Sequence, residues 1–156
     1  MRKQPILIAY RRFERLQELL FARGYLIDPG GRDPNEWQDD PPLGLVRLKG
    51  VALQGEAEEA EPDPRITFSI AELWSIDRVE NAYQEQGYWL AGYSYHGQVG
   101  DVSLRYCFDP QRHPAMPYHR HPPSSKAREP WRRVGVEEAL EGVDALVAEQ
   151  RRAERL

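Results

Sequence analysis

The sequence lacks most of the features that assign a chain to a functional class directly. It contains one cysteine, Cys107, which excludes a disulfide within the chain. It has no apolar run of about 20 residues and no charged-then-apolar leader, so we expect a cytoplasmic protein without membrane contact. It also has no glycine-rich phosphate loop, nucleophile elbow or dinucleotide fingerprint, so the common nucleotide-binding and serine-hydrolase signatures are excluded.

Histidine is scarce and confined to one stretch. The 156-residue chain has four histidines, at positions 96, 113, 119 and 121. Between Tyr95 and Arg133, seven basic residues stand against three acidic ones, a local net charge of +4 in a chain whose net charge is −4. This distribution argues against a uniformly basic nucleic-acid binder but permits an anionic ligand near the histidines. A solvated charged surface without a ligand is the alternative.

The length and the hydrophobic patterning predict one α+β domain over residues 1–156. Apolar residues recur at helical spacing from Ile6 to Arg23, with Gly24 as a helix stop, and again over 136–147. Four segments between these helices have strand patterns: 43–53, 65–76, 87–96 and 101–108. The short links between them predict a four-stranded antiparallel meander with the N-terminal and C-terminal helices on one face.

Three segments are expected to be irregular. Residues 28–42 are dense in proline, glycine and aspartate, and residues 55–64 form an acidic run, so both are predicted to be flexible loops. Six prolines stand between positions 109 and 130 and would break any helix. The proline- and histidine-rich stretch after the last strand is therefore expected to be extended or looped.

Alternation along the strands predicts which side chains share a face. The link GQVG predicts a hairpin between the last two strands, in which apolar positions match apolar positions. The predicted apolar set comprises Trp89, Ala91, Tyr93, Tyr95, Val102, Leu104, Tyr106 and Phe108. This register puts Ser94, His96 and Arg105 together on the opposite face.

One acidic residue conflicts with this alternation. Glu72 falls on the apolar side of the strand at 65–76, where an unpaired carboxylate would be costly. It lies at the solvated end of the strand, or a bulge turns it outward, or an arginine or histidine pairs with it.

The four histidines are compatible with three kinds of site. A metal site would use His119 and His121, which point the same way if the backbone is extended, with His113 or His96 to close it, although no carboxylate stands at a familiar ligand spacing. A metal-free phosphodiester site would use two histidines as acid and base, with Arg105 and Arg120 on the phosphate. Alternatively, the histidines are polar loop residues that bind a partner protein.

Other side chains near the histidines have two interpretations each. Tyr95 and Tyr106 could stack on single-stranded bases, or they are ordinary sheet residues. Cys107 is interpreted as a small buried hydrophobic residue rather than a nucleophile.

The segment from Tyr93 to His121 resembles the TumE family of toxins from toxin–antitoxin systems. The similarity consists of YSYH at a strand end, RY on the next strand, then HP, further prolines and the triplet HRH before a C-terminal helix. Cys107 stands where the family usually has aspartate. The resemblance marks these residues: His96, Arg105, Tyr106, His113, His119 and His121. It implies a small toxin that acts on RNA and is neutralised by a protein antitoxin encoded beside it.

The leading hypothesis is therefore a TumE-like toxin that is a metal-independent ribonuclease, with no cofactor. The expected catalytic residues are His96, His113, His119 and His121. The expected substrate-binding residues are Arg105, Arg120, Tyr106 and Tyr95. The alternative hypothesis is a non-catalytic domain whose histidine loop binds a partner protein or a metal.

Overall fold

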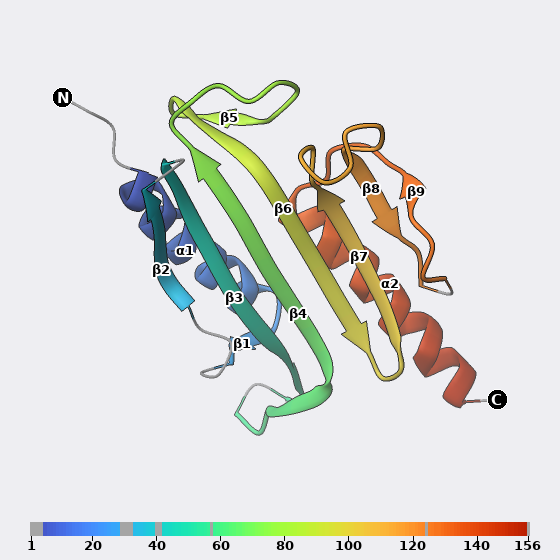
Figure 1. The fold of residues 1–156 in the computed structure, drawn as a ribbon. Coiled ribbons are helices and arrows are strands. Elements are labelled where there is room, and N and C mark those ends of the chain that lie inside the picture. Colours follow the sequence, from blue (N-terminus) through green and yellow to red (C-terminus); the bar gives the residue numbers. More distant parts are fainter. Residues whose placement is uncertain (1–4, 29–32, 40–41, 57, 124, 156) are drawn as a thin grey trace.

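The computed structural model describes residues 5–28, 33–39, 42–56, 58–123 and 125–155. Over these residues the chain forms two helices and a nine-stranded antiparallel sheet (Figure 1). The helices are α1 (Pro5–Ala22) and α2 (Val136–Glu154). The strands are β1 (Tyr25–Ile27), β2 (Asp33–Asp39), β3 (Pro42–Gln54), β4 (Glu61–Ser75), β5 (Gln84–Glu85), β6 (Tyr88–Val99), β7 (Val102–Phe108), β8 (Tyr118–His121) and β9 (Glu129–Pro130). Neither described helix is long and apolar enough to cross a membrane.

The four predicted strands form the centre of the sheet. They correspond to β3, β4, β6 and β7, which pair antiparallel in chain order as expected for a meander. The sheet continues at both edges, because β1 and β2 pair with β3, and β8 and β9 follow β7. A short strand, β5, also pairs with β6. The prediction of a four-stranded sheet is therefore wrong, whereas the α+β class and the two terminal helices are confirmed.

Most of the additional strands arise in segments that were expected to be irregular. β2 lies within 28–42, β4 begins at Glu61 inside the acidic run, and β8 and β9 lie in the proline-rich stretch. Proline is tolerated at the first position of a strand and at a sheet edge, because its missing N–H is not needed there for a hydrogen bond between strands. Residues 29–32, 40–41 and 57 of the predicted loops lie outside the described residues.

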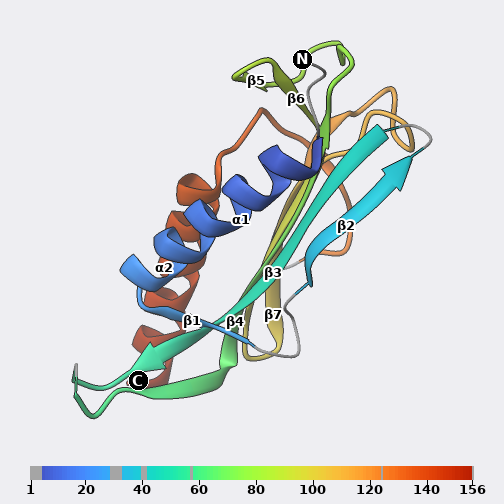
Figure 2. The ribbon, with the colours of Figure 1, turned by 90° about the vertical axis from the view of Figure 1, so that its left-hand side faces the viewer.

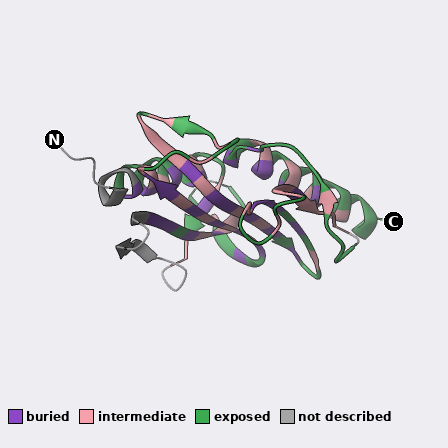
Figure 3. Ribbon diagram, turned by 45° about the horizontal axis from the view of Figure 1, so that its top comes forward, coloured by how far each residue is buried: buried purple, intermediate pink, exposed green. Residues whose placement is uncertain are grey.

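Both helices lie against the same face of the sheet (Figure 2). α1 contacts β1 to β4, and α2 contacts β6 and β7. Buried positions follow the strands and the inner sides of the helices (Figure 3). Most apolar residues of the two predicted helices are buried, among them Phe13, Leu16, Leu20, Leu140 and Val143. The core therefore lies between the helices and one side of the sheet.

α2 approaches the sheet closely at two glycines. A Cβ atom on Gly97 of β6 would overlap Cγ2 of Val143. A Cβ atom on Gly142 of α2 would lie 2.7 Å from the hydroxyl oxygen of Tyr106. Glycine at these two positions permits the observed distance between the helix and the sheet.

The predicted register of the β6–β7 hairpin is confirmed. Tyr95 is the cross-strand partner of Tyr106, and His96 is the partner of Arg105. The strands are joined at Gly100 and Asp101, and the φ of +61° at Gly100 fits a type II′ turn, which favours glycine at its first central position. His96 and Arg105 therefore share the face opposite the core, as predicted.

The start of β6 differs from the prediction. A bulge in the β4–β6 pairing makes Leu90 the partner of Trp74, although Gly92 is the partner of Leu73. Leu90 is consequently buried against the helices, and Trp89 and Ala91 are half-buried. Because an extra residue reverses the side of every position before it, simple alternation assigned Trp89 and Ala91 to the wrong face.

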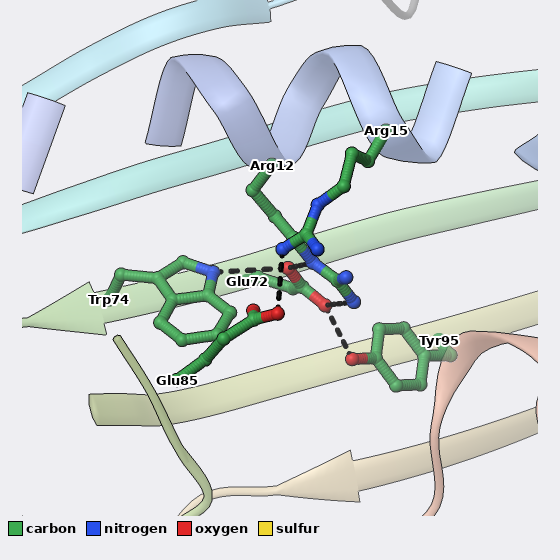
Figure 4. Close-up of polar contacts among 6 residues, drawn as sticks. All are labelled: Arg12, Arg15, Glu72, Trp74, Glu85 and Tyr95. Atoms are coloured by element: carbon green, nitrogen blue, oxygen red, sulfur yellow. Dashed lines mark hydrogen bonds and ion pairs between the residues drawn. The ribbon is translucent and has the colours of Figure 1, made fainter. Parts of the chain in front are cut away.

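Glu72 is buried on the helix side of β4 and has an arginine partner (Figure 4). Nε and Nη2 of Arg12 in α1 donate to its two carboxylate oxygens at 2.8 and 3.0 Å. The Tyr95 hydroxyl donates to Oε2 at 2.6 Å, and the Trp74 indole N–H donates to Oε1 at 3.1 Å. The third of the sequence alternatives is thus confirmed, and both carboxylate oxygens are satisfied.

The buried position of Tyr95 beside Glu72 also shifts the pKa of the Tyr95 hydroxyl. Burial raises the pKa of its hydroxyl well above the ordinary value, and the neighbouring Glu72 charge raises it further. The hydroxyl therefore remains a donor to Glu72 at any physiological pH.

Replacing Arg12 should destabilise the protein severely. The change Arg12→Ala leaves the Glu72 carboxylate buried without its cation, which costs about 3–5 kcal/mol in the free energy of unfolding. The matched control is Arg15→Ala, since Arg15 is half exposed and pairs with Glu85 at 2.8 Å on the surface, where a pair contributes about 0–1 kcal/mol. Urea unfolding followed by tryptophan fluorescence measures both. Equal losses in the two variants would contradict the buried-pair interpretation.

Candidate functional site

The face of the sheet that the helices leave uncovered carries three of the four histidines; in Figure 1 the helices lie behind the sheet. We call it the open face. From β3 to β8 its strand positions include Leu45, Arg47, Lys49 and Val51 of β3, Thr67, Ser69, Ala71 and Leu73 of β4, Ser94, His96 and Gln98 of β6, Ser103, Arg105 and Cys107 of β7, and His119 and His121 of β8. Three of these positions are Arg or Lys and none is acidic, whereas β2 at the edge adds two acidic positions, Asp33 opposite Arg47 and Glu36 opposite Leu45.

Cross-strand pairing places five of these side chains in one row. Lys49 pairs with Ser69, and Ser69 pairs with His96. His96 then pairs with Arg105, and Arg105 pairs with His121. Neighbouring strands are about 5 Å apart, so Arg105 has one imidazole on each side within side-chain reach. We call these residues the cationic row.

The adjacent row contains a second group of polar side chains. Ser94 pairs with Cys107, and Cys107 pairs with His119. The sulfur of Cys107 and one ring nitrogen each of His119 and His121 all lie within 4.8 Å of one another. Cys107 is 8% exposed and His119 is 3% exposed, whereas His121 is half-buried. The donor atoms of these three residues are the ones that could hold a metal ion.

The loop between β7 and β8 folds back because its backbone groups form hydrogen bonds with one another. The Asp109 N–H donates to the Pro117 carbonyl at 2.9 Å, and the His113 N–H donates to the Asp109 carbonyl at 3.0 Å. The Met116 N–H donates to the His113 carbonyl at 3.0 Å. These bonds bring β8 alongside β7, and they are the reason that His119 and His121 reach Arg105.

His113 lies on this loop at the margin of the histidine group. Its ring meets the ring of His119 edge to face at 5.2 Å, and His119 meets His121 in the same way at 5.3 Å. Nη1 of Arg128 lies 2.7 Å from Nδ1 and 2.5 Å from Nε2 of His113. Because a guanidinium can only donate, one of the two ring nitrogens accepts.

The histidines of the open face are held in the neutral form. Burial lowers the pKa of His96, and the charge of Arg105 lowers it further. Burial also lowers the pKa values of His119 and His121. A neutral imidazole carries one lone pair, which can accept a proton or bind a metal. Burial raises the pKa of the Cys107 thiol.

Three of the predicted substrate contacts lie on the other side of the sheet. Tyr95 and Tyr106 face the helices and are 1% and 7% exposed. Arg120, the partner of Tyr106, pairs with Glu129 at 2.6 Å and lies 4.0 Å above the ring of Trp131. These residues therefore do not join the histidines, because alternation along β8 separates Arg120 from His119 and His121.

Sequence reasoning missed Lys49 and Ser69, which complete the cationic row. The signal was present in LVRLKG, where Arg47 and Lys49 alternate with apolar residues as expected for one solvated strand face. Lys49 also borders an open hollow of about 540 Å³ that is lined by Arg65, Thr67 and Gln98 among others. The hollow extends the polar surface away from the histidines.

Comparison with known proteins adds no relative. No protein-family model, curated protein or solved structure matches this chain. The resemblance to TumE toxins therefore rests on residues 93–121 themselves.

The pKa of His96 should depend on Arg105. In Arg105→Gln the pKa of His96 should rise, because a neighbouring positive charge is removed, and it should stay below the ordinary value because burial remains. NMR titration of the imidazole protons measures it. Arg112→Gln is the control, since that side chain is 84% exposed on the loop. An unchanged His96 pKa in Arg105→Gln would show that the two side chains are not neighbours.

Proposed function

We propose that this protein is a TumE-like toxin that cleaves single-stranded RNA on the open face. The observation that carries the proposal is the cationic row, in which Arg105 stands between His96 and His121. The sequence resemblance supports the same function, because it covers these three residues. Together they provide a phosphate contact and neutral imidazoles within reach of it.

The charge distribution supports binding of a polyanion at this place. Lys49 and Arg105 lie in a row of positions without an acid, and the acidic positions of this face, Asp33 and Glu36, lie at its β2 edge, in a chain with a net charge of −4. The rest of the surface therefore repels RNA, and the open face attracts it. Since Tyr95 and Tyr106 lie on the other side, binding depends on phosphate contacts. Such binding weakens steeply with salt and discriminates little between bases.

The chemistry follows from the protonation states. A neutral His96 can accept the proton of a ribose 2′-hydroxyl, and this makes the 2′-oxygen a nucleophile for the adjacent phosphorus. The guanidinium of Arg105 can stabilise the charge that grows on the phosphate oxygens. As the 2′-oxygen bonds to phosphorus, the bond from phosphorus to the 5′-oxygen breaks, and the leaving oxygen takes up a proton. We assign that proton to the protonated form of His121, which lies on the far side of Arg105 and which burial makes the minor form. These roles need no metal ion.

The toxin assignment implies a cellular partner. A protein antitoxin encoded beside the gene would neutralise the toxin in the cytoplasm. This part of the proposal requires that expression of the protein arrests growth and that co-expression of the neighbouring gene product relieves the arrest.

Variants of the cationic row should lose RNA cleavage. His96→Ala should slow cleavage of a single-stranded RNA oligonucleotide by about 10²–10⁴-fold, because it removes the general base. Arg105→Gln should slow it by about 10²–10³-fold through loss of charge stabilisation. Gel analysis of products measures both, in EDTA as well as without it, because the proposed roles need no metal. Arg112→Gln should cleave at the wild-type rate.

Two outcomes would count against the proposal. A folded His96→Ala protein with wild-type cleavage would exclude the base role. Growth arrest by a folded double variant, His119→Ala with His121→Ala, would exclude a part for the β8 histidines in toxicity.

A further inference from the structure

The strongest unassigned feature is the group of donors formed by Cys107, His119 and His121. Cys107 and His119 are direct cross-strand partners, and His121 follows two positions along β8 on the same face. Side chains two apart on a strand point the same way, so strand pairing alone brings the three together. We propose that Cys107, His119 and His121 bind a zinc ion.

The three donor atoms are close enough to bind one zinc ion after small side-chain movements. The three donor atoms lie within 4.8 Å of one another. Around tetrahedral zinc, with bonds of about 2.0–2.3 Å, neighbouring donor atoms stand about 3.4–3.6 Å apart. Small rotations of the side chains about χ1 and χ2 bring the donors to that separation. The backbone stays in place, because both strands are part of the sheet.

Each donor is oriented by a second group, as metal ligands in proteins usually are. Nδ1 of His119 lies 3.1 Å from the Met116 carbonyl, so donation to that oxygen leaves the lone pair on Nε2. The ring of His121 donates to the backbone of Lys126. The Ser94 side chain forms a hydrogen bond to the sulfur of Cys107, which offsets part of the rise in pKa that burial causes.

The donor set selects the class of metal. One thiolate and two imidazoles suit zinc and other late first-row ions and do not suit calcium or magnesium, which take oxygen ligands. Three protein ligands leave the fourth tetrahedral position open, as in zinc sites that bind a further ligand. His121 is the least buried of the three and lies beside Arg105, so the open position adjoins a cation. An anionic fourth ligand is therefore favoured.

Sequence reasoning kept a metal site on His119 and His121 as an alternative but did not include Cys107, which was interpreted as a hydrophobic residue. The β7–β8 register changes this by supplying the thiol as the third donor. Binding of the ion can be measured without RNA cleavage, so the two proposals are tested separately although both use His121.

Cobalt(II) titration of the full-length, metal-stripped protein tests the site directly. Binding at one ion per chain should produce the near-ultraviolet thiolate-to-cobalt absorption and the strong visible bands of a four-coordinate ion, and zinc should displace both. Cys107→Ala should lose the thiolate band, and His119→Ala or His121→Ala should weaken binding by more than about 100-fold, beyond the usual effect of an orienting residue. Ser94→Ala should weaken it by about 10–100-fold.

His96→Ala is the matched control, because it removes an imidazole from the same face but from outside the donor group. It should bind cobalt with wild-type affinity. Cys107→Ala keeps the result interpretable if a histidine variant fails to fold, since alanine is smaller than cysteine. The proposal is overturned if the wild-type protein gives no thiolate band, or if Cys107→Ala retains it, or if His96→Ala abolishes binding.

Discussion

The bidentate pair between Arg12 and Glu72 is the interaction on which the rest of the structure depends. A carboxylate with no exposed surface tolerates only a complete set of partners, and here the set comes from α1, β4 and β6. The pair fixes α1 on one side of the sheet. It also fixes Tyr95, whose hydroxyl must reach Glu72 at 2.6 Å. Because strand side chains alternate, the next residue, His96, must point to the opposite side. The buried cluster thereby determines which face carries the histidines.

Strand pairing then fixes which face the side chains of the neighbouring strands occupy. Tyr95 pairs with Tyr106 on the core side, so Arg105 joins His96 on the open face, and His121 follows through β8. A slip of one residue in any pair would bury Arg105 and expose Tyr106, which the close packing of α2 on Tyr106 and Gly97 opposes. The core therefore specifies the site without contributing a side chain to it.

Much of this arrangement could be predicted from the sequence. Periodicity was sufficient for both helices and the four long strands, and apolar matching was sufficient for the His96–Arg105 pair. The edge strands were missed because β2 and β8 lie in proline- and aspartate-containing segments that pair through tertiary context. Without β8, neither the separation of Arg120 from the histidines nor the approach of Cys107 to His119 could be foreseen. The bulge that turns Leu90 toward the core could not be predicted, because the alternation of apolar and polar residues in the sequence gives no sign of it.

The two proposed uses of the open face meet at His121. Its single lone pair can be given to a metal ion or to a proton, but not to both at once. His96 and Arg105 lie outside the donor group, so phosphate binding and general-base action do not compete with a bound ion. An ion beside Arg105 would add a second positive charge next to the phosphate position, which strengthens attraction for RNA. The metal would then favour binding and oppose the proton transfer at His121. Experiments that separate binding from cleavage therefore distinguish the two roles of one residue.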